Sequence, residues 1–480
     1  MMRDLNHDEH QFIAPPALLL HAGLLPYRDY ACFHAPDLIF VFAALFATTP
    51  HFLLAARAFN AFCAALLLLL LFAFAVRRFR AVPERNWFVG LGVVLLLSLN
   101  PFFRFTAGRA WNHDLAVLAL VAAFLAFLRV EKSARPWLWL ALCGAGVGLA
   151  AGTRLSFAPM VAPFALAVLL FPISGRKRIV SLTILGGGAA LSLLPVAVLF
   201  SIAPRAFIFD NFTYNSAINL LYREATVPGE IAFWNKLSFP FQYFLRSPSD
   251  ILLIGGFVYF ALRPWWRGGW AGWRHDRELS LLVLLLPFIF IGSWAPVPSY
   301  RQYYYPFVPF LLLGNIIGLA REHPFQLRTM RLLWLAVIVS LLEAIPSLPS
   351  SLGQLAPSTW PVFSVHEKAE AIAALLPRGR VLTLAPLFPL EAGREIYPEF
   401  ATGPFAWRTA SLLDPERRAA FGFVAPADLE RYLAADPPAA ILTGFEHHEF
   451  DLPLLRYARS HGYVGHLSPT RGVLWLPAKQ

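Results

Sequence analysis

Residues 52–76 read FLLAARAFNAFCAALLLLLLFAFAV, a run that is apolar almost from end to end. A helix of about 20 apolar residues spans the hydrocarbon core of a bilayer, because each residue adds about 1.5 Å of rise. This stretch is therefore long enough to cross a membrane. It ends at Arg77-Arg78-Phe79-Arg80, a basic cluster of the kind that flanks membrane helices on the cytoplasmic side.

The composition of the whole chain agrees with this interpretation. Of its 480 residues, 58% are hydrophobic and only 14% are charged, whereas soluble proteins average about 25% charged residues. The formal net charge is +11, and the basic residues fall in short clusters between apolar runs. This pattern is typical of a polytopic membrane protein, and we expect no nucleic-acid partner. The three cysteines, Cys32, Cys63 and Cys143, have no zinc-binding spacing.

The apolar runs predict about ten membrane spans. They lie near residues 52–76, 87–103, 114–129, 137–152, 156–172, 179–202, 249–263, 279–295, 303–320 and 330–346. Alternate loops are basic, and the positive-inside rule assigns these loops to the cytoplasm. They are residues 77–85, 129–135, 176–178, 263–277 and 321–331. Residues 1–50, loop 203–248 and the chain after about 347 are then expected on the extracytoplasmic face of the bacterial inner membrane.

The regions outside the spans differ in character. No apolar segment precedes residues 1–50 to carry them across the membrane, and a start codon further upstream explains this better than a later span dragging them across. Residues 37–49 are apolar but short, which predicts an interfacial or re-entrant helix. Loop 203–248 is rich in aromatic and polar residues. We expect it to lie on the membrane surface or to cap a cavity.

The tail alternates between strand and helix patterns. Residues 380–385, 439–443 and 472–476 read as strands, and 428–435 and 454–461 read as helices. The predicted fold is therefore mainly α. It is a polytopic helical bundle over residues 51–347, preceded by an external loop with interfacial helices over 1–50 and followed by a small α/β extracytoplasmic domain over 360–480.

Residues 1–50 also carry motifs that point to a function. Asn6-His7-Asp8-Glu9-His10 is followed by GLLPYRD at 23–29 and by His34-Ala35-Pro36. This order resembles the first external loop of GT-C glycosyltransferases, which include protein O-mannosyltransferases and lipid A aminoarabinose transferases. The resemblance extends over residues 1–345. It implies an enzyme that transfers a sugar from a polyprenyl-phosphate donor in the bilayer to a glycan, lipid or protein acceptor.

The resemblance also implies roles for residues of this loop. The family's aspartate at the start of the loop, a catalytic base or acceptor-orienting group, falls on Asp8, with Glu9 as its neighbour. Inversion at C1 of the sugar needs a base that takes the proton of the attacking acceptor. Tyr27 and His34, from the two downstream motifs, are expected to contact substrate. A solvated polar terminus is the alternative interpretation of the two acids.

A second acid, Asp114, stands where a predicted span begins, after Trp111-Asn112-His113. The resemblance places an acid here that faces the same cavity, with His113 beside it as a substrate contact. An ionisable group at a membrane boundary usually has a partner or a function. Helix N-capping is the alternative, because aspartate does this well. Both interpretations can hold together.

Basic residues near the same face are expected to hold the donor phosphate. Arg154 lies in a short turn between two spans, and Arg301 and Tyr304 belong to the stretch SYRQYYYP at 299–306. The resemblance places both arginines near the lipid phosphate, and a guanidinium group can donate two hydrogen bonds to phosphate oxygens. Anchoring of arginine and tyrosine at the membrane interface is the alternative. Weaker candidates on this face are Arg104 and Arg109.

Some alternatives remain open at this stage. The histidines at 7, 10, 21 and 34 leave a divalent metal open, although solvated or substrate-contacting histidines fit their spacing better. A lipid-linked polysaccharide polymerase or ligase would also pair external arginines with a lipid-linked sugar. A transporter or lipid flippase would instead distribute its polar groups along a path through the bilayer.

Overall fold

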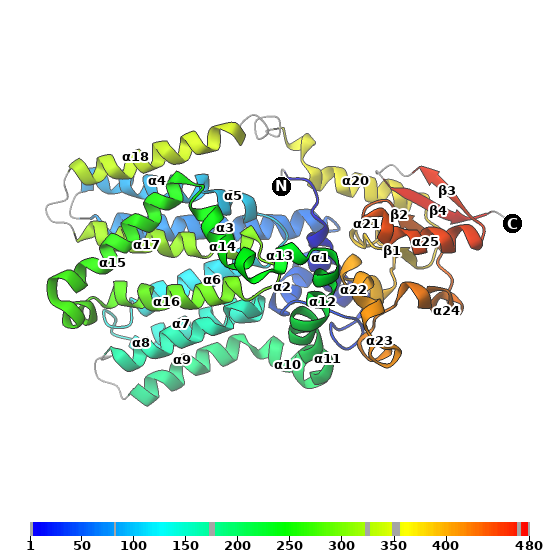
Figure 1. The fold of residues 1–480 in the computed structure, drawn as a ribbon, viewed down its shortest axis with the longest axis horizontal. Coiled ribbons are helices and arrows are strands. Elements are labelled where there is room, and N and C mark those ends of the chain that lie inside the picture. Colours follow the sequence, from blue (N-terminus) through cyan, green and yellow to red (C-terminus); the bar gives the residue numbers. More distant parts are fainter. Residues whose placement is uncertain are drawn as a thin grey trace.

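A computed structural model describes residues 3–80, 83–171, 178–321, 327–347, 356–467 and 472–478. Of the predicted basic loops, Arg176 and Lys177 lie outside these residues, as does the start Met1-Met2. The molecule is elongated, with a bundle of long helices at one end and a small α/β unit at the other (Figure 1). The N-terminal helix lies at the junction of the two parts.

Ten helical stretches of the described chain coincide with the ten predicted spans. By length and composition, α3 Phe52–Arg78, α7 Pro136–Thr153, α16 Arg277–Trp294 and the stretch Arg301–Ala320 can each cross a membrane. The last stretch comprises η3 Arg301–Tyr304 and α17 Phe307–Ala320. Two bent pairs raise this number to six. They are α9 Arg178–Ser192 with α10 Leu194–Ile202, bent by 60°, and α14 Phe233–Phe244 with α15 Pro248–His275, bent by 95°.

The remaining predicted spans are helices that do not meet the combined criteria of length and apolar composition. They are α4 Pro83–Leu99 with α5 Pro101–Thr106, α6 His113–Phe127, η1 Leu155–Met160 with α8 Val161–Leu170, and α18 Leu327–Ala344 with η4 Ile345–Ser347. The sequence therefore predicted the positions of the helices. Within the described residues, up to six of the ten stretches are both long enough and apolar enough to be a full span.

Glycines allow a close contact between helices α7 and α9. An added Cβ at Gly144 of α7 would lie 1.9 Å from the carbonyl oxygen of Leu185, and at Gly148 it would lie 2.4 Å from that of Ala189. The backbones of α7 and α9 therefore touch directly. Small residues four apart drive helix association in lipid by this kind of close packing.

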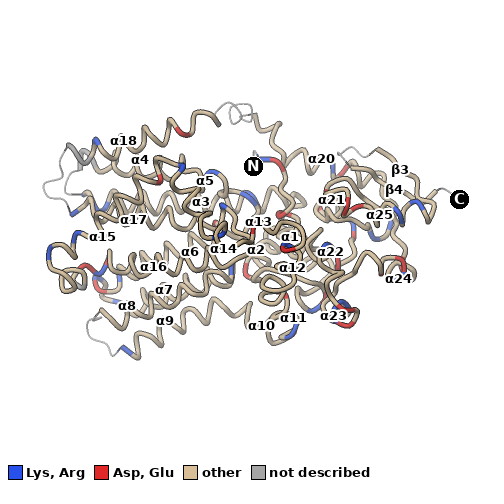
Figure 2. The backbone as a smooth tube through the Cα atoms, viewed as in Figure 1, with Lys and Arg blue, Asp and Glu red and all other residues tan. Residues whose placement is uncertain are grey.

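The basic loops converge at the end of the bundle that lies away from the α/β unit (Figures 1 and 2). Glu278, at the start of α16, lies 2.6 Å from Arg78, 3.1 Å from Arg321 and 3.7 Å from Lys132. Arg78, Lys132 and Arg321 belong to three different predicted basic loops, and Glu278 directly follows a fourth, residues 263–277. Charges are scarce along the middle of the helices (Figure 2), as the apolar interior of a bilayer requires.

The N-terminal region forms α1 His7–Ala22 and α2 Asp37–Phe46. Asn6 begins α1 with a capping box: its side chain accepts from the Asp8 N–H, and the Glu9 side chain accepts from the Asn6 N–H. The short helix predicted over 37–49 is confirmed as α2. Loop 203–248 is helical, with α11 Pro204–Ile208, the π-helix η2 Phe209–Ile218, α12 Asn219–Thr226, α13 Pro228–Ile231 and α14.

The C-terminal α/β unit contains a four-stranded sheet in the order β1-β2-β4-β3. The strands are β1 Val381–Thr383, β2 Ala440–Thr443, β3 Tyr463–Leu467 and β4 Val473–Pro477, and only β1 and β2 are parallel. The sequence predicted β1, β2 and β4 but missed β3, whose exposed GYVGHL pattern has few buried positions. The predicted helix over 454–461 begins earlier, as part of α25 His448–Ser460.

Short helices pack around the sheet, and several of them lie on the side of the membrane bundle (Figure 1). They are η5 Pro357–Thr359, α20 Pro361–Ala373, α21 Leu387–Glu391, η6 Pro398–Phe400, α22 Pro404–Thr409, η7 Ala410–Leu412, α23 Pro415–Phe421, η8 Pro426–Asp428 and α24 Leu429–Leu433. One apolar core joins residues of α1, α2 and α3 to residues of α20, α21 and the sheet. The N-terminal helices and the α/β unit thus pack against one another through buried side chains.

Candidate active site

A cavity of about 610 Å³ lies where the helix bundle, the N-terminal helices and the α/β unit meet. This is within the usual range of small-molecule sites, about 300–1,000 Å³. Its lining comes from the start of α1, the loop before α2, Phe105 of α5, the chain around the start of α6, the turn between α7 and η1, helices η2 and α12, residues 291–303, and α22. The predicted residues among its lining are Asp8, His34, His113 and Arg154.

Asp8 faces this cavity from the first turn of α1. Its Oδ1 lies 3.2 Å from Nε2 of His7, and its side chain is 27% exposed. Burial raises the pKa of Asp8, but the hydrogen bond from His7 and the charges of His7 and Arg408 outweigh burial, so that the pKa lies below its ordinary value. The carboxylate is therefore ionised at neutral pH and can accept a proton from a substrate hydroxyl.

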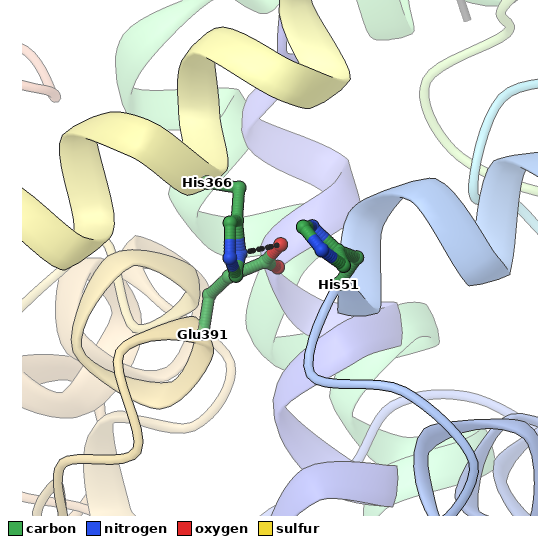
Figure 3. Close-up of side chains that lie close together, drawn as sticks. All are labelled: His51, His366 and Glu391. Atoms are coloured by element: carbon green, nitrogen blue, oxygen red, sulfur yellow. Dashed lines mark hydrogen bonds and ion pairs between the residues drawn. The ribbon is translucent and has the colours of Figure 1, made fainter.

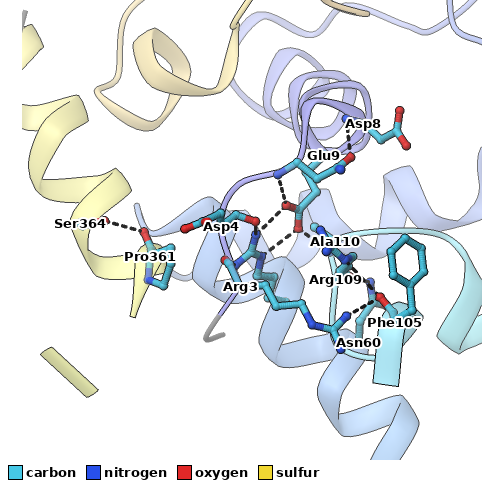
Figure 4. A network of polar contacts seen from close by, with 12 residues as sticks. Arg3, Asp4, Asp8, Glu9, Asn60, Phe105, Arg109, Ala110, Pro361 and Ser364 are labelled. Atoms are coloured by element: carbon cyan, nitrogen blue, oxygen red, sulfur yellow. Dashed lines mark hydrogen bonds and ion pairs between the residues drawn. The ribbon is translucent and has the colours of Figure 1, made fainter. Parts of the chain in front are cut away.

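Glu9, which the sequence placed beside Asp8 in the same role, points in another direction (Figure 4). Its side chain is fully buried and lies 2.6 Å from Arg57 of α3. One carboxylate oxygen also accepts from the Ala110 N–H, and the other from the Asn6 N–H. Glu9 does not line the cavity. It connects the start of α1 to α3 and to the chain before α6, which holds the neighbouring Asp8 in place.

Arg154 enters the cavity from the end of α7 and is held by three neutral partners. Nε donates to Oγ of Ser156 at 2.9 Å, and Nη1 donates to Oδ1 of Asn112 at 3.3 Å and to Nε2 of His113 at 2.6 Å. The guanidinium group also lies 4.6 Å from the ring centre of Tyr303. Among the described residues, no carboxylate lies within ion-pair distance of Arg154. A partly buried cation without a counter-ion favours an anionic ligand.

Two further arginines line the cavity that the sequence did not single out. Arg408 of α22 donates to Oδ1 of Asn219 at 3.2 Å and lies over the rings of Tyr222 and Phe405. Within the described chain it has no carboxylate at ion-pair distance either. Arg223 of α12 donates to the hydroxyl of Tyr300 at 3.0 Å and lies 3.9 Å from the half-exposed Glu230. Three guanidinium groups therefore face one hollow together with the carboxylate of Asp8.

His34 and Tyr27 belong to one turn of the N-terminal loop. Tyr27 adopts a left-handed backbone conformation, with φ at +67°, which is uncommon for a residue with a Cβ. Its hydroxyl donates to the backbone carbonyl of His34, and its ring packs against Phe207, so Tyr27 shapes the loop without lining the cavity. The His34 ring stacks on Phe12 at 4.3 Å. Burial, with the charge of Arg154, lowers the pKa of His34 to about 4, so the imidazole is neutral.

Asp114 lies close to the cavity but behind its wall. Its side chain is 2% exposed, and Oδ2 accepts from the Gly108 N–H at 2.8 Å. The N-cap of α6 is Asn112, so Asp114 lies in the first turn and does not cap the helix. The acid and the adjoining His113 therefore have different positions, because only His113 lines the cavity.

Arg301 and Tyr304 also lie outside the lining of the cavity. Arg301 lies over the ring of Phe105, with its guanidinium carbon 3.9 Å from the ring centre. Phe105 itself lines the cavity, and its backbone carbonyl accepts from Arg3 and Arg109. Tyr304 is fully buried among aromatic rings of α14 and α17. Arg3, Arg109 and Arg301 therefore form a second basic cluster next to Phe105.

The N-terminal histidines do not gather around a common point. His7 contacts Asp8 and stacks on Phe405, His10 packs near Phe388, and His21 packs near Phe52. Among the residues that the structure describes, the one group of three ligands close enough to hold a metal ion lies elsewhere.

The cavity can therefore hold a molecule that has both an anionic group and hydroxyl groups. Sequence patterns found Asp8, His34, His113 and Arg154 because they follow recognisable motifs. Arg223 and the asparagines of η2 carried a weaker signal, the polar and aromatic composition of loop 203–248. Arg408 had none, because it reaches the cavity only through docking of the α/β unit.

The chain shares its overall fold with solved structures of GT-C glycosyltransferases, and it is an integral membrane protein. The crystal structure of ArnT, the lipid A aminoarabinose transferase from Cupriavidus metallidurans, bound to undecaprenyl phosphate, is similar over 100% of this chain and 96% of that chain, with a TM-score of 0.60 and 13% identity. The crystal structure of the same protein in the apo state has a TM-score of 0.58 and 15% sequence identity to this chain.

A second solved structure with this fold is the Archaeoglobus fulgidus oligosaccharyltransferase in complex with Zn and sulfate. Its TM-score is 0.50 with 14% identity, over 98% of this chain and 69% of that chain. No protein-family model and no curated protein sequence matches the chain. The predicted GT-C resemblance and the predicted fold class are thus confirmed by structure.

Proposed function

We propose that the protein is a membrane glycosyltransferase that moves a sugar from a polyprenyl-phosphate donor to an acceptor hydroxyl on the extracytoplasmic face. The observation that carries this proposal is the cavity, which combines one ionised carboxylate, Asp8, with the arginines 154, 223 and 408. The protein shares its fold with an ArnT structure that contains undecaprenyl phosphate. The basic loops support the orientation, because they converge at the opposite end of the bundle.

The reaction follows from the charges. The acceptor oxygen attacks C1 of the sugar while the bond from C1 to the lipid phosphate oxygen breaks, which inverts C1. The acceptor proton passes to the carboxylate of Asp8, and the lipid phosphate leaves as an anion. Arg154 and Arg408 stabilise the charge that develops on the phosphate, because preorganised cations act strongly where water is excluded. His34, which is neutral, can hydrogen-bond to a sugar or acceptor hydroxyl.

Two variants of the N-terminal segment test the role of Asp8. Asp8→Asn keeps the shape of the side chain but removes the base, and we expect turnover to fall by about 10²–10⁴-fold. Binding of undecaprenyl phosphate to the detergent-solubilised protein should change little. Asp4→Asn is the matched control, because the exposed Asp4 does not line the cavity.

Turnover is measured as release of undecaprenyl phosphate from a panel of undecaprenyl-phosphate-linked sugars, in proteoliposomes that also receive a membrane extract as the source of acceptor. Wild-type turnover in Asp8→Asn would remove Asp8 as the base. Absence of release and absence of undecaprenyl phosphate binding in the wild-type protein would reject the proposed transfer as a whole.

A further inference from the structure

Three side chains with metal-binding groups meet at the junction of the membrane bundle and the α/β unit. His51 is the residue that precedes α3, His366 lies on α20, and Glu391 ends α21. One ligand atom from each lies within 4.8 Å of the others, and Figure 3 shows the three side chains facing a common point. None of them lines the cavity described above.

Glu391 is the reason to expect a cation here. Its side chain is fully buried, with one oxygen 3.2 Å from Nδ1 of His366 and the other accepting from the Leu53 N–H at 3.1 Å. Among the described residues, no lysine or arginine lies within ion-pair distance of it. A buried carboxylate without a positive partner costs several kcal/mol, and a metal ion is one way to remove that cost.

The two histidines offer nitrogen atoms to the same point. Their ring centres are 3.7 Å apart, and Nδ1 of His51 is buried without a hydrogen-bond partner. His366 presents Nδ1 to Glu391, while its Nε2 lies 3.5 Å from a carboxylate oxygen of Glu370 one helical turn further on. A ligating histidine usually donates its other ring N–H to a carboxylate, which fixes the orientation of the ring. Glu370 is placed for that second contact.

The distances are close to those of a zinc site. Zinc binds histidine nitrogen and carboxylate oxygen at about 2.0–2.2 Å, which places tetrahedral ligand atoms roughly 3.4 Å from one another. The His366 and Glu391 atoms are already 3.2 Å apart. The ligand atom of His51 lies within 4.8 Å of the other two, so it must approach them by at most about 1.4 Å, which is within the reach of a side-chain rotation.

We propose that His51, His366 and Glu391 form a zinc site that clamps the α/β unit to membrane helix α3. Two histidines and one glutamate are a recognised zinc ligand set, with water in the fourth position. Residue 51 belongs to the membrane part, and residues 366 and 391 belong to the α/β unit. Bound metal would therefore stabilise the docking that brings Arg408 to the cavity, because a ligand that binds only the docked form favours it.

The test is the metal content of the full chain, purified in detergent through an affinity tag that contains no histidine. We expect about one zinc per chain by mass spectrometry after dialysis against metal-free buffer. His366→Ala and Glu391→Gln should lose this zinc, and Glu370→Gln should weaken zinc affinity about 10–100-fold. The matched controls are His461→Ala and Glu430→Gln, from an exposed pair 3.3 Å apart in the same unit, and these should keep it.

Cobalt(II) gives an independent readout of the ligand set. Loaded wild-type protein should show the visible absorption of tetrahedral cobalt, and His51→Gln, at the half-buried ligand, should lose it while remaining folded. Zinc that dialyses away, or that His51→Gln and Glu391→Gln retain at the wild-type level, would show an adventitious ion only and overturn the proposal. The zinc content is measured without turnover, so the zinc site and the proposed sugar transfer can each be refuted without refuting the other.

Discussion

Replacing Glu9 by glutamine removes the charge from the most buried ion pair of the N-terminal region. The Glu9 and Arg57 side chains are 0% and 1% exposed. One Glu9 oxygen accepts from Arg57 Nε and the Ala110 N–H, and the other accepts from Arg57 Nη2 and the Asn6 N–H. Glutamine has one oxygen, so in either orientation one guanidinium donor and one backbone N–H lose their acceptor.

The size of the effect follows from that count. Removing one partner of a buried ion pair lowers the free energy of unfolding by about 3–5 kcal/mol, because the remaining charge is left uncompensated. The unfolding entropy is about 2.1 cal/mol/K per residue, or about 1 kcal/mol/K for this chain, so Glu9→Gln should lower the melting temperature by roughly 3–5 °C. Replacing Arg57 by methionine as well should recover part of this loss, because no charge is then left buried.

Acid pH should act on the same pair. Burial raises the pKa of Glu9, but the hydrogen bonds and charge of Arg57 outweigh burial, and the net pKa lies below the ordinary value of 4.5. The stabilisation from a carboxylate with a lowered pKa is present above its unfolded pKa and is lost as the pH falls through the folded pKa. Glu9→Gln should therefore lose less stability than the wild type on acidification below about pH 4.5.

The assay is thermal unfolding of the detergent-solubilised protein, followed by tryptophan fluorescence. Asp8→Asn is the comparison, because Asp8 is partly exposed and contacts only His7 among the described side chains. It should shift the melting temperature by less than about 1 °C. If Glu9→Gln melts like the wild type yet abolishes turnover, Glu9 acts in the chemistry and the supporting role is wrong.

Three further predictions concern the cavity and the bundle. His7→Ala removes the hydrogen bond that holds down the pKa of Asp8, so the acid limb of the kcat/KM profile should move to higher pH; an unmoved limb would contradict Asp8 as the base. Arg408→Gln should weaken undecaprenyl phosphate binding by about 10-fold or more, and Arg301→Ala by less, because only Arg408 lines the cavity. The reverse order in a binding titration would place the phosphate beyond Phe105. Gly148→Leu should lower the melting temperature by several degrees, because its Cβ meets a backbone oxygen at 2.4 Å, whereas leucine at residue 186, where nothing lies within 4 Å, should not.

The positions of the membrane helices could be predicted because lipid permits few alternatives. A backbone in hydrocarbon must satisfy its own hydrogen bonds, so each apolar run of sufficient length becomes a helix. The lengths of the helices were less predictable. Residues 179–202 read as one span, but the structure bends there by 60° between α9 and α10. An apolar pattern alone does not report such a bend, but a signal did exist, because Pro195 lies in the first turn of α10 and a proline cannot continue the backbone hydrogen bonds of a preceding helix.

The site was predictable where its residues follow one another in the chain. Asp8 and His34 belong to motifs with fixed spacing, and both line the cavity. The role of Glu9 was harder to predict, because its partner Arg57 is 48 positions away. A signal did exist, since Arg57 is a charge inside an otherwise apolar span, and such a charge usually has a partner. An expected ion pair between Arg57 and one of the two N-terminal acids would have predicted that Asp8 and Glu9 have different roles.

The α/β unit contributes residues to the candidate site. Its helix α22 brings Phe405 against His7, which in turn holds Asp8, and brings Arg408 into the same cavity. The proposed base, Asp8, and the proposed phosphate-binding cation, Arg408, therefore depend on one docking surface. Loss of a contact across that surface should reduce both the ionisation of Asp8 and the affinity for phosphate, whereas a change at Arg408 alone should reduce affinity without moving the acid limb by a comparable amount. This difference between a docking defect and a binding defect can be measured in the same pH and titration series.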